Sequence, residues 1–211
     1  MTEFLSLIGI ESPEYLLLLL IPFPLILLLL ETNIFNKRSG EFTRKIAHIV
    51  SGAVILLAFS LLSYTELIIF LITLTGAALI ARYVHFDELY AIRRASMGVI
   101  LFPLGILLTV LLFGTSNLTA LYFALLILIV SDSLAAIIGG KWGRRQAFFD
   151  KSLLGSLVFF LSSFVIAIIF IQNIWTAFFA AVLLTIMEYI SVKGIDNVTI
   201  PISAVFLFLV L

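Results

Sequence analysis

Long apolar runs separated by short polar segments dominate this chain. Eight runs can be delimited, at about residues 15–30, 44–62, 66–84, 97–113, 118–140, 152–171, 175–190 and 198–211. A membrane-spanning helix needs about 20 predominantly apolar residues, and most of these runs approach that length. The run 198–211 would cover only about 21 Å of a hydrocarbon core about 30 Å thick. The pattern therefore predicts an all-α, polytopic membrane protein with about seven to eight transmembrane helices, the last of them short.

The composition supports the same fold class. The chain is 63% hydrophobic and 11% charged, whereas about a quarter of the residues in soluble domains are charged. We therefore expect residues 1–211 to form a single transmembrane domain in the lipid bilayer. The segment before residue 15 has acidic but no basic residues, unlike a signal peptide, so the run 15–30 is expected to be a retained helix.

The basic residues predict an orientation. All 12 Lys and Arg lie in the segments that follow the first, third, fifth and seventh apolar runs or at the adjoining ends of the runs, where Arg44, Lys45 and Arg82 stand. Short loops rich in Lys and Arg stay on the cytoplasmic side. We therefore expect both termini outside and the basic loops in the cytoplasm, with the cytoplasmic membrane as the location if the source is prokaryotic.

Asp132 is the most unusual residue of the apolar runs. A charge at membrane depth costs about 3 kcal/mol unless another group pairs with it. Ala135, Gly139 and Gly143 follow on the same helical face. Close helix packing explains the two glycines equally well, because they match a small-xxx-small pattern. Packing does not explain the aspartate, which points to a functional site.

Basic and small residues accompany this aspartate at the predicted cytoplasmic side. Arg44 and His48 lie on one face of a helix. Arg44 could be a membrane anchor and His48 a buried histidine, or both could line a cleft. Either Ser152 or Asp150 can cap the next helix. The free backbone N–H groups at the start of that helix form an anion-binding site. Lys151 lies next to that site and could bind a phosphate. It could also be one of the basic residues that commonly flank membrane spans on the cytoplasmic side.

Three carboxylates gather near the same side, on Asp132, Glu188 and Asp196. Carboxylate oxygens suit Mg²⁺, which proteins usually hold with one or two carboxylates plus substrate phosphates. The chain has no Cys and only two His, which excludes thiolate metal sites and argues against zinc. Arg93 and Arg94 form a further cytoplasmic cluster, either an anchor or a phosphate-binding element.

With these residues laid out, the chain resembles the CTP-dependent lipid-alcohol kinases, namely the dolichol, phytol and polyprenol kinases, which are distantly related to the phosphatidate cytidylyltransferases. Three blocks carry the resemblance: Arg44, Lys45 and His48; Asp132, Ala135, Gly139, Gly143, Lys151, Ser152 and Gly155; and Glu188, Asp196, Asn197 and Pro201. The chain departs from the family pattern at Asp150, Ser152 and Leu154. The likeness covers about residues 40–201 and leaves the run 15–30 outside it as an extra N-terminal helix.

The resemblance implies phosphoryl transfer from CTP, with Mg²⁺, to the hydroxyl of a long-chain isoprenoid alcohol at the cytoplasmic membrane face. It implies that Asp132 and Asp196 hold the metal, and that His48 or Glu188 orients or deprotonates the alcohol. Nucleotide contacts are then expected from Arg44, Lys45, Ala135, Gly139, Gly143, Lys151, Ser152, Gly155 and Asn197. The expected partners are the lipid substrate, the nucleotide and the bilayer, without nucleic acid, and a homo-oligomer is compatible with the sequence.

Two other functions remain open from the sequence. A cytidylyltransferase would use the same nucleotide and a lipid, but would attack the α-phosphate. A small transporter could relay ions through Asp132, His48 and Glu188. A relay would also need polar groups near the outer face, where the sequence offers few. The kinase is therefore the preferred hypothesis.

Overall fold

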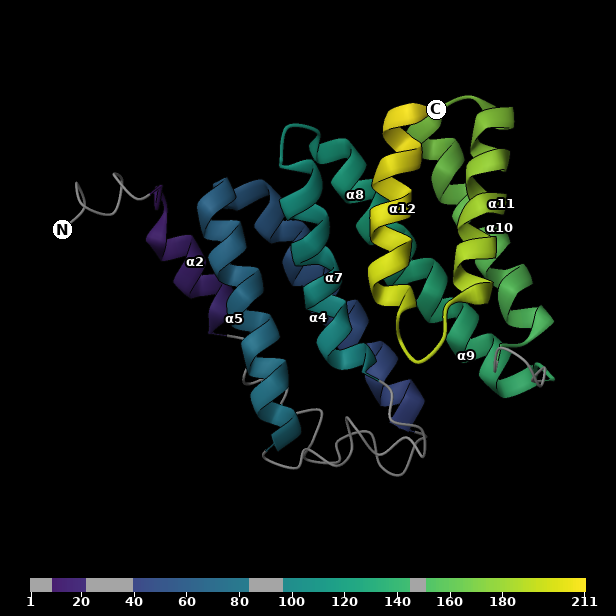
Figure 1. Cartoon of the computed structure of the whole chain (residues 1–211), viewed down its shortest axis with the longest axis horizontal. Helices are drawn as coiled ribbons and strands as arrows, with labels where there is room; N and C mark the ends of the chain where they lie inside the picture. The colour runs from purple at the N-terminus through teal and green to yellow at the C-terminus, as the bar shows by residue number, and fades with distance from the viewer. Residues whose placement is uncertain (1–8, 22–39, 84–96, 145–150) are drawn as a thin grey trace.

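The computed structural model describes residues 9–21, 40–83, 97–144 and 151–211, and the elements that these residues form are all helical. The predicted all-α fold is therefore confirmed for this part of the chain. The helices, shown in Figure 1, are α2 (Pro13–Leu20), α4 (Gly40–Leu61), α5 (Tyr64–Tyr83), α7 (Gly98–Phe113), α8 (Leu118–Leu126), α9 (Asp132–Trp142), α10 (Leu153–Ile171), α11 (Ile174–Ile190) and α12 (Asp196–Val210).

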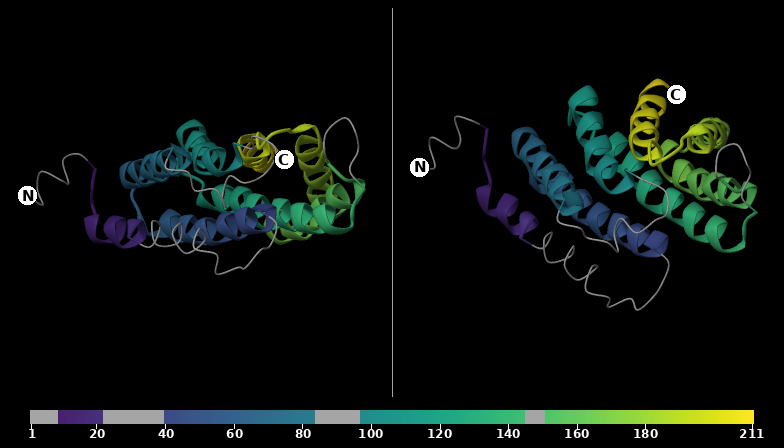
Figure 2. Two further views of the ribbon diagram at one scale, coloured as in Figure 1. Left: turned by 90° about the horizontal axis from the view of Figure 1, so that it is seen from below. Right: turned by 60° about the horizontal axis from the view of Figure 1, so that its bottom comes forward.

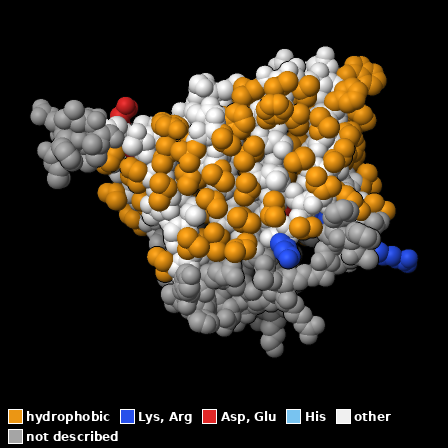
Figure 3. All heavy atoms as spheres, in the orientation of Figure 1, with side chains coloured by type: hydrophobic (Ala, Val, Ile, Leu, Met, Phe, Trp, Pro, Cys, Tyr) orange, Lys and Arg blue, Asp and Glu red, His pale blue; other side chains and the backbone are white. Residues whose placement is uncertain are grey.

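Two of the described helices are long and apolar enough to cross a membrane. One is the 25-residue stretch Leu118–Trp142, and the other is Leu153–Ile171. The remaining apolar helices have stretches of 10–17 residues, so the count of seven to eight spans stays a prediction. Only the start of the expected helix 15–30 is described, as part of α2. The surface in Figure 3 is largely hydrophobic, and the Lys and Arg side chains visible on it lie along its lower part.

The helices pack in pairs that bring distant parts of the chain together. α10 lies against α9 and α11, α12 lies against α7 and α8, and α5 lies against α7. Figures 1 and 2 show the resulting layout, with α2 at one edge and the α10–α11 pair at the other. The core is apolar, and Phe70, Phe123 and Phe159 are completely buried in it. The start of α10 and the turn between α11 and α12 lie toward the same end of the molecule (Figure 1).

A π-helical turn, Ile127–Ser131, joins α8 to α9 directly before Asp132. Such single turns inside α-helices are rare and occur often at functional sites. The turn changes the helical register, so it sets the direction in which the Asp132 side chain leaves the helix. The sequence pattern predicted one regular helix here and missed this turn.

Glu66 is a buried acid with a structural explanation. Ser63 precedes α5, and its hydroxyl accepts a bond from the Glu66 backbone N–H (3.4 Å) while its own backbone N–H donates to Glu66 Oε2 (2.8 Å). This reciprocal arrangement is a capping box. Glu66 Oε1 also accepts from the Ser12 backbone N–H (2.6 Å), directly before α2. The carboxylate therefore attaches the N-terminal helix to α5.

Candidate active site

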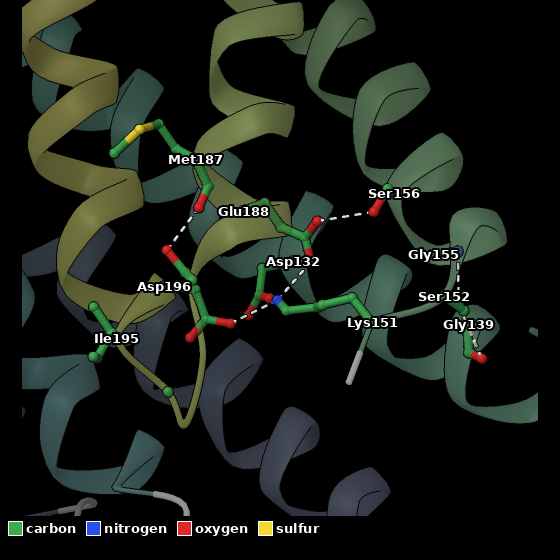
Figure 4. A network of polar contacts seen from close by, with 12 residues as sticks. Asp132, Gly139, Lys151, Ser152, Gly155, Ser156, Met187, Glu188, Ile195 and Asp196 are labelled. Atoms are coloured by element: carbon green, nitrogen blue, oxygen red, sulfur yellow. Dashed lines mark hydrogen bonds and ion pairs between the residues drawn. The ribbon is translucent and has the colours of Figure 1, made fainter. Parts of the chain in front are cut away.

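A buried ionic cluster joins all three motif blocks of the sequence. The acids come from the start of α9 (Asp132), the end of α11 (Glu188) and the start of α12 (Asp196), and their exposed fractions are 2%, 2% and 9%. The lysines are Lys45 on α4 and Lys151 directly before α10. Carboxylates taken this far out of water need compensating partners. Figure 4 shows Asp132, Lys151, Glu188 and Asp196 of this cluster together.

Lys151 binds two of the acids at once. Its Nζ donates to Glu188 Oε1 at 2.5 Å and to Asp196 Oδ2 at 2.9 Å. Burial lowers the pKa of this ammonium, but the charges of Asp196, Glu188 and Asp132 outweigh the burial, so the pKa lies above its ordinary value. The lysine is therefore cationic at any physiological pH. Its side chain remains 21% exposed, so it keeps access to solvent.

Lys45 pairs with the third acid. Its Nζ donates to Asp132 Oδ2, and the two side chains are 2% and 3% exposed. The pair joins α4 to α9, and it supplies the partner that a carboxylate at this depth requires. The family resemblance implies that Lys45 contacts the nucleotide; no contact in the structure tests that role.

Two neutral side chains hold the acids of the cluster. The Ser156 hydroxyl on α10 donates to Glu188 Oε2 at 3.2 Å, so both oxygens of this carboxylate are engaged. Asn197, which is completely buried, donates from Nδ2 to Gly194 O at 3.0 Å and to Asp196 Oδ1 at 3.2 Å. The sequence analysis gave Ser156 no role. Its position one turn after Ser152 on the same helix face was the signal that could have found it.

His48 lies one turn beyond Lys45 on the same face of α4. The residue is 3% exposed, and its ring stacks on Phe102 of α7, with 4.4 Å between the ring centroids and an angle of 15°. The stacking fixes the plane of the imidazole between α4 and α7. Its role in handling the alcohol stays a prediction.

The glycines near Asp132 lie where α9 and α10 cross. Ser152 caps α10, because its hydroxyl accepts from the Gly155 backbone N–H at 3.0 Å, and the same hydroxyl donates to Gly139 O at 3.3 Å. A Cβ added to Gly139 would lie 2.6 Å from Ser152 Oγ, and one on Gly143 would lie 2.2 Å from it. Helix packing, the alternative that the sequence left open, therefore accounts for Gly139, Gly143 and Gly155. A nucleotide contact of these residues or of the buried Ala135 stays a prediction.

Several predicted residues cannot be placed in this cluster. Arg44 belongs to α4, but the structure describes only its backbone. Arg93, Arg94 and Asp150 lie outside the described residues. Their expected contacts with phosphate therefore stay predictions.

The carboxylates of Asp132 and Asp196 fit a magnesium ion whose other ligands would be phosphate oxygens of the nucleotide and water. Among residues 9–21, 40–83, 97–144 and 151–211, no three His, Cys, Asp or Glu side chains are grouped as metal ligands. Mg²⁺ usually takes only one or two protein carboxylates and completes its shell with phosphate oxygens and water. Asp196 contacts the Lys151 ammonium, and the charge of Asp132 also acts on it. Both carboxylates therefore act on one cation, the Lys151 ammonium, and would act in the same way on a bound metal ion.

The chain as a whole is similar to known proteins. The chain is 32% identical to a phytol kinase of Synechocystis over 195 residues, which cover 83% of this chain and 82% of that protein. It is 28% identical over 183 residues to an uncharacterized protein of Methanocaldococcus jannaschii, covering 79% of this chain and 92% of that protein. No protein-family model matches the chain, and no solved structure matches it.

Proposed function

Because this chain belongs to the phytol kinase family, we propose that it is a membrane kinase that phosphorylates an isoprenoid alcohol, with CTP as the donor and Mg²⁺ as the cofactor. The observation that carries the proposal is the contact of Lys151 with both Glu188 and Asp196. This contact brings two separate motif blocks of the sequence to one buried ionic cluster, and Lys45 on the first block binds Asp132 in the same cluster.

The reaction needs little covalent chemistry from the protein. The alcohol oxygen attacks the γ-phosphorus, the bond from that phosphorus to the bridging oxygen breaks, and a prenyl phosphate and CDP result. Catalysis of such a transfer is mostly positioning and neutralisation of charge. Buried, preorganised charges suit this task better than exposed ones.

Each side chain of the cluster then has a role. Asp132 and Asp196 would hold the magnesium ion, which when bound supplies positive charge to the phosphate oxygens. Lys151 would neutralise phosphate oxygens, together with the N-terminal N–H groups of α10 and with Arg44. Its exposed fraction of 21% allows it to reach an incoming anion. Glu188 or His48 would orient the alcohol and receive its proton.

The position of the cluster suits a lipid substrate. A nucleotide arrives from water and the alcohol from the bilayer, so they meet where polar groups lie at the end of an apolar helix bundle. Glu188 lies at the end of α11 and Asp196 at the start of α12, whereas Asp132 lies 10 residues before the end of the continuous helical stretch Leu118–Trp142. We place this end of an integral membrane protein in the cytoplasm, and both termini outside, from the distribution of Lys and Arg.

The direct test uses purified full-length protein and a panel of prenols that differ in length, including phytol and geranylgeraniol. Each is incubated with Mg²⁺ and with CTP, ATP, UTP or GTP in turn, and the lipid products are measured by mass spectrometry. The proposal predicts a prenyl monophosphate, formed best with CTP. Absence of any phosphorylated prenol, or a product that carries the whole nucleotide, would overturn it.

A further inference from the structure

The two lysines of the ionic cluster differ in their burial. Lys151 lies in the segment before α10 and keeps 21% of its side chain exposed. Lys45 lies inside α4 with only 2% of its side chain exposed, and it is among the largest fully buried side chains of the described structure. Lys151 is therefore the more accessible of the two lysines to a ligand from water.

The partners of the two lysines differ as well. Lys151 divides its hydrogen bonds between Glu188 and Asp196, so it can release one acid and still be paired. Lys45 binds the carboxylate of Asp132, whose side chain is 3% exposed. If Lys45 turned toward a phosphate, it would leave a buried carboxylate without this cation, which is strongly unfavourable. The ion pair between Lys45 and Asp132 is thus expected to persist during the reaction.

From this geometry we propose that Lys45 is a positioning residue, which fixes the Asp132 carboxylate for the magnesium–nucleotide complex and does not itself bind phosphate. The inference rests on the proposed function, and it replaces the nucleotide-binding role that the sequence alone suggested for Lys45. Lys151 is then the cluster lysine that meets the nucleotide. Two features set the orientation of the Asp132 side chain: the π-helical turn that precedes it and the ammonium of Lys45.

The kinetic test compares Lys45→Met, Lys45→Arg and the control Lys141→Met. Lys141 is an exposed lysine on α9 that lies 4.5 Å from the ring centroid of Trp142. Misplacing a reactive group by about 1 Å can cost about 100-fold, so Lys45→Met should lower kcat by about that factor. The KM for nucleotide should change by less than about threefold, and the half-saturating Mg²⁺ concentration should rise. Lys45→Arg should recover part of kcat, because a guanidinium also pairs with a carboxylate.

A second measurement makes the pairing testable without catalysis. Thermal unfolding of the purified full-length protein is compared for Lys45→Met, Asp132→Asn and the double variant. If the residues act as a pair, the double variant loses less stability than the sum of the two single losses.

Two results would overturn the proposal: a rise of about tenfold or more in the nucleotide KM of Lys45→Met with kcat nearly retained, or strictly additive stability losses. Failure of the wild type to phosphorylate any prenol would instead refute the proposed function, and the unfolding comparison would still decide whether Lys45 positions Asp132.

Discussion

Lys151 and Asp196 are 45 residues apart in the sequence, yet Nζ of the lysine lies 2.9 Å from Oδ2 of the aspartate. The contact joins the segment before α10 to the start of α12, and Glu188 on α11 completes it at 2.5 Å. One ammonium therefore links three helices at the end of the bundle where the candidate active site lies. Substitutions in this cluster should separate binding, catalysis and stability.

Asp132→Asn should abolish phosphoryl transfer and leave membrane insertion intact. The amide keeps the shape of the side chain but removes the charge that would hold the metal. Loss of one preorganised electrostatic group typically costs about 100- to 1,000-fold in kcat. Initial rates with purified protein measure the loss, and gel filtration in detergent checks that the variant is folded. Turnover close to that of the wild type would remove Asp132 from the catalytic residues.

Lys151→Met should weaken nucleotide binding more than Lys45→Met does. The lysine is accessible, and its charge would be placed against the phosphates, so the KM for nucleotide should rise about tenfold or more, the effect of one lost charged hydrogen bond. Lys151→Arg should recover part of the affinity. An unchanged KM in Lys151→Met would contradict the assigned role.

The pH dependence of stability gives an independent check on Lys151. The pKa of its ammonium is raised by the neighbouring acids, so the stabilisation is fully present below the unfolded-state value of about 10.4 and is lost only as the pH rises through the higher folded-state value. The difference in Tm between wild type and Lys151→Met should therefore be constant from about pH 7 to about pH 9. A difference that shrinks within this interval would show that the ammonium is not held in this way.

Ser156→Ala should lower kcat by about fivefold, because a hydrogen bond contributes about 1 kcal/mol. The change frees Oε2 of Glu188, which Ser156 holds at 3.2 Å. Ser162→Ala is the matched control on the same helix, since the hydroxyl of Ser162 bonds only to carbonyls of its own helix among the described residues. Equal effects of the two substitutions on kcat would argue against a positioned Glu188.

Gly139→Ala should destabilise the protein, whereas Gly140→Ala should not. A Cβ on Gly139 would lie 2.6 Å from Ser152 Oγ and 2.8 Å from the Cα of Gly155, so α9 and α10 would have to separate. Overpacking of this kind costs about 1–3 kcal/mol. A Cβ on Gly140 meets nothing within 4 Å, and alanine there should be neutral or stabilise by about 0.5–1 kcal/mol. Thermal unfolding measures both; a stable Gly139→Ala protein would show that the helices do not pack this closely.

The sequence predicted the helical fold, because apolar runs are a local pattern. It also predicted that the motif blocks gather on one membrane face, because they lie near those ends of the apolar runs that adjoin the basic segments. The pairing of Lys45 with Asp132 did not follow, because it depends on which faces of α4 and α9 touch. The sequence also did not predict the π-helical turn before Asp132, since no residue type indicates that a helix contains an extra residue in one turn.

Close backbone contacts were also beyond the sequence. The carbonyl oxygen of Asn197 lies 2.0 Å from where a Cβ on Gly105 would be, so α12 and α7 touch at this glycine. Nothing near Gly105 in the sequence indicates its partner, which is 92 positions further along the chain. The capping box of Ser63 and Glu66, in contrast, had a readable pattern.

Isotopic labelling is the sharpest test of whether a terminal phosphoryl group passes from a nucleotide to a prenol. Purified protein is incubated with Mg²⁺, a prenol and CTP radiolabelled at either the γ- or the α-phosphate, and the label in the lipid fraction is counted. We expect the γ-label to enter the lipid and the α-label to stay in water as CDP. An α-label in the lipid, or no lipid label from either nucleotide, would refute phosphoryl transfer to the prenol.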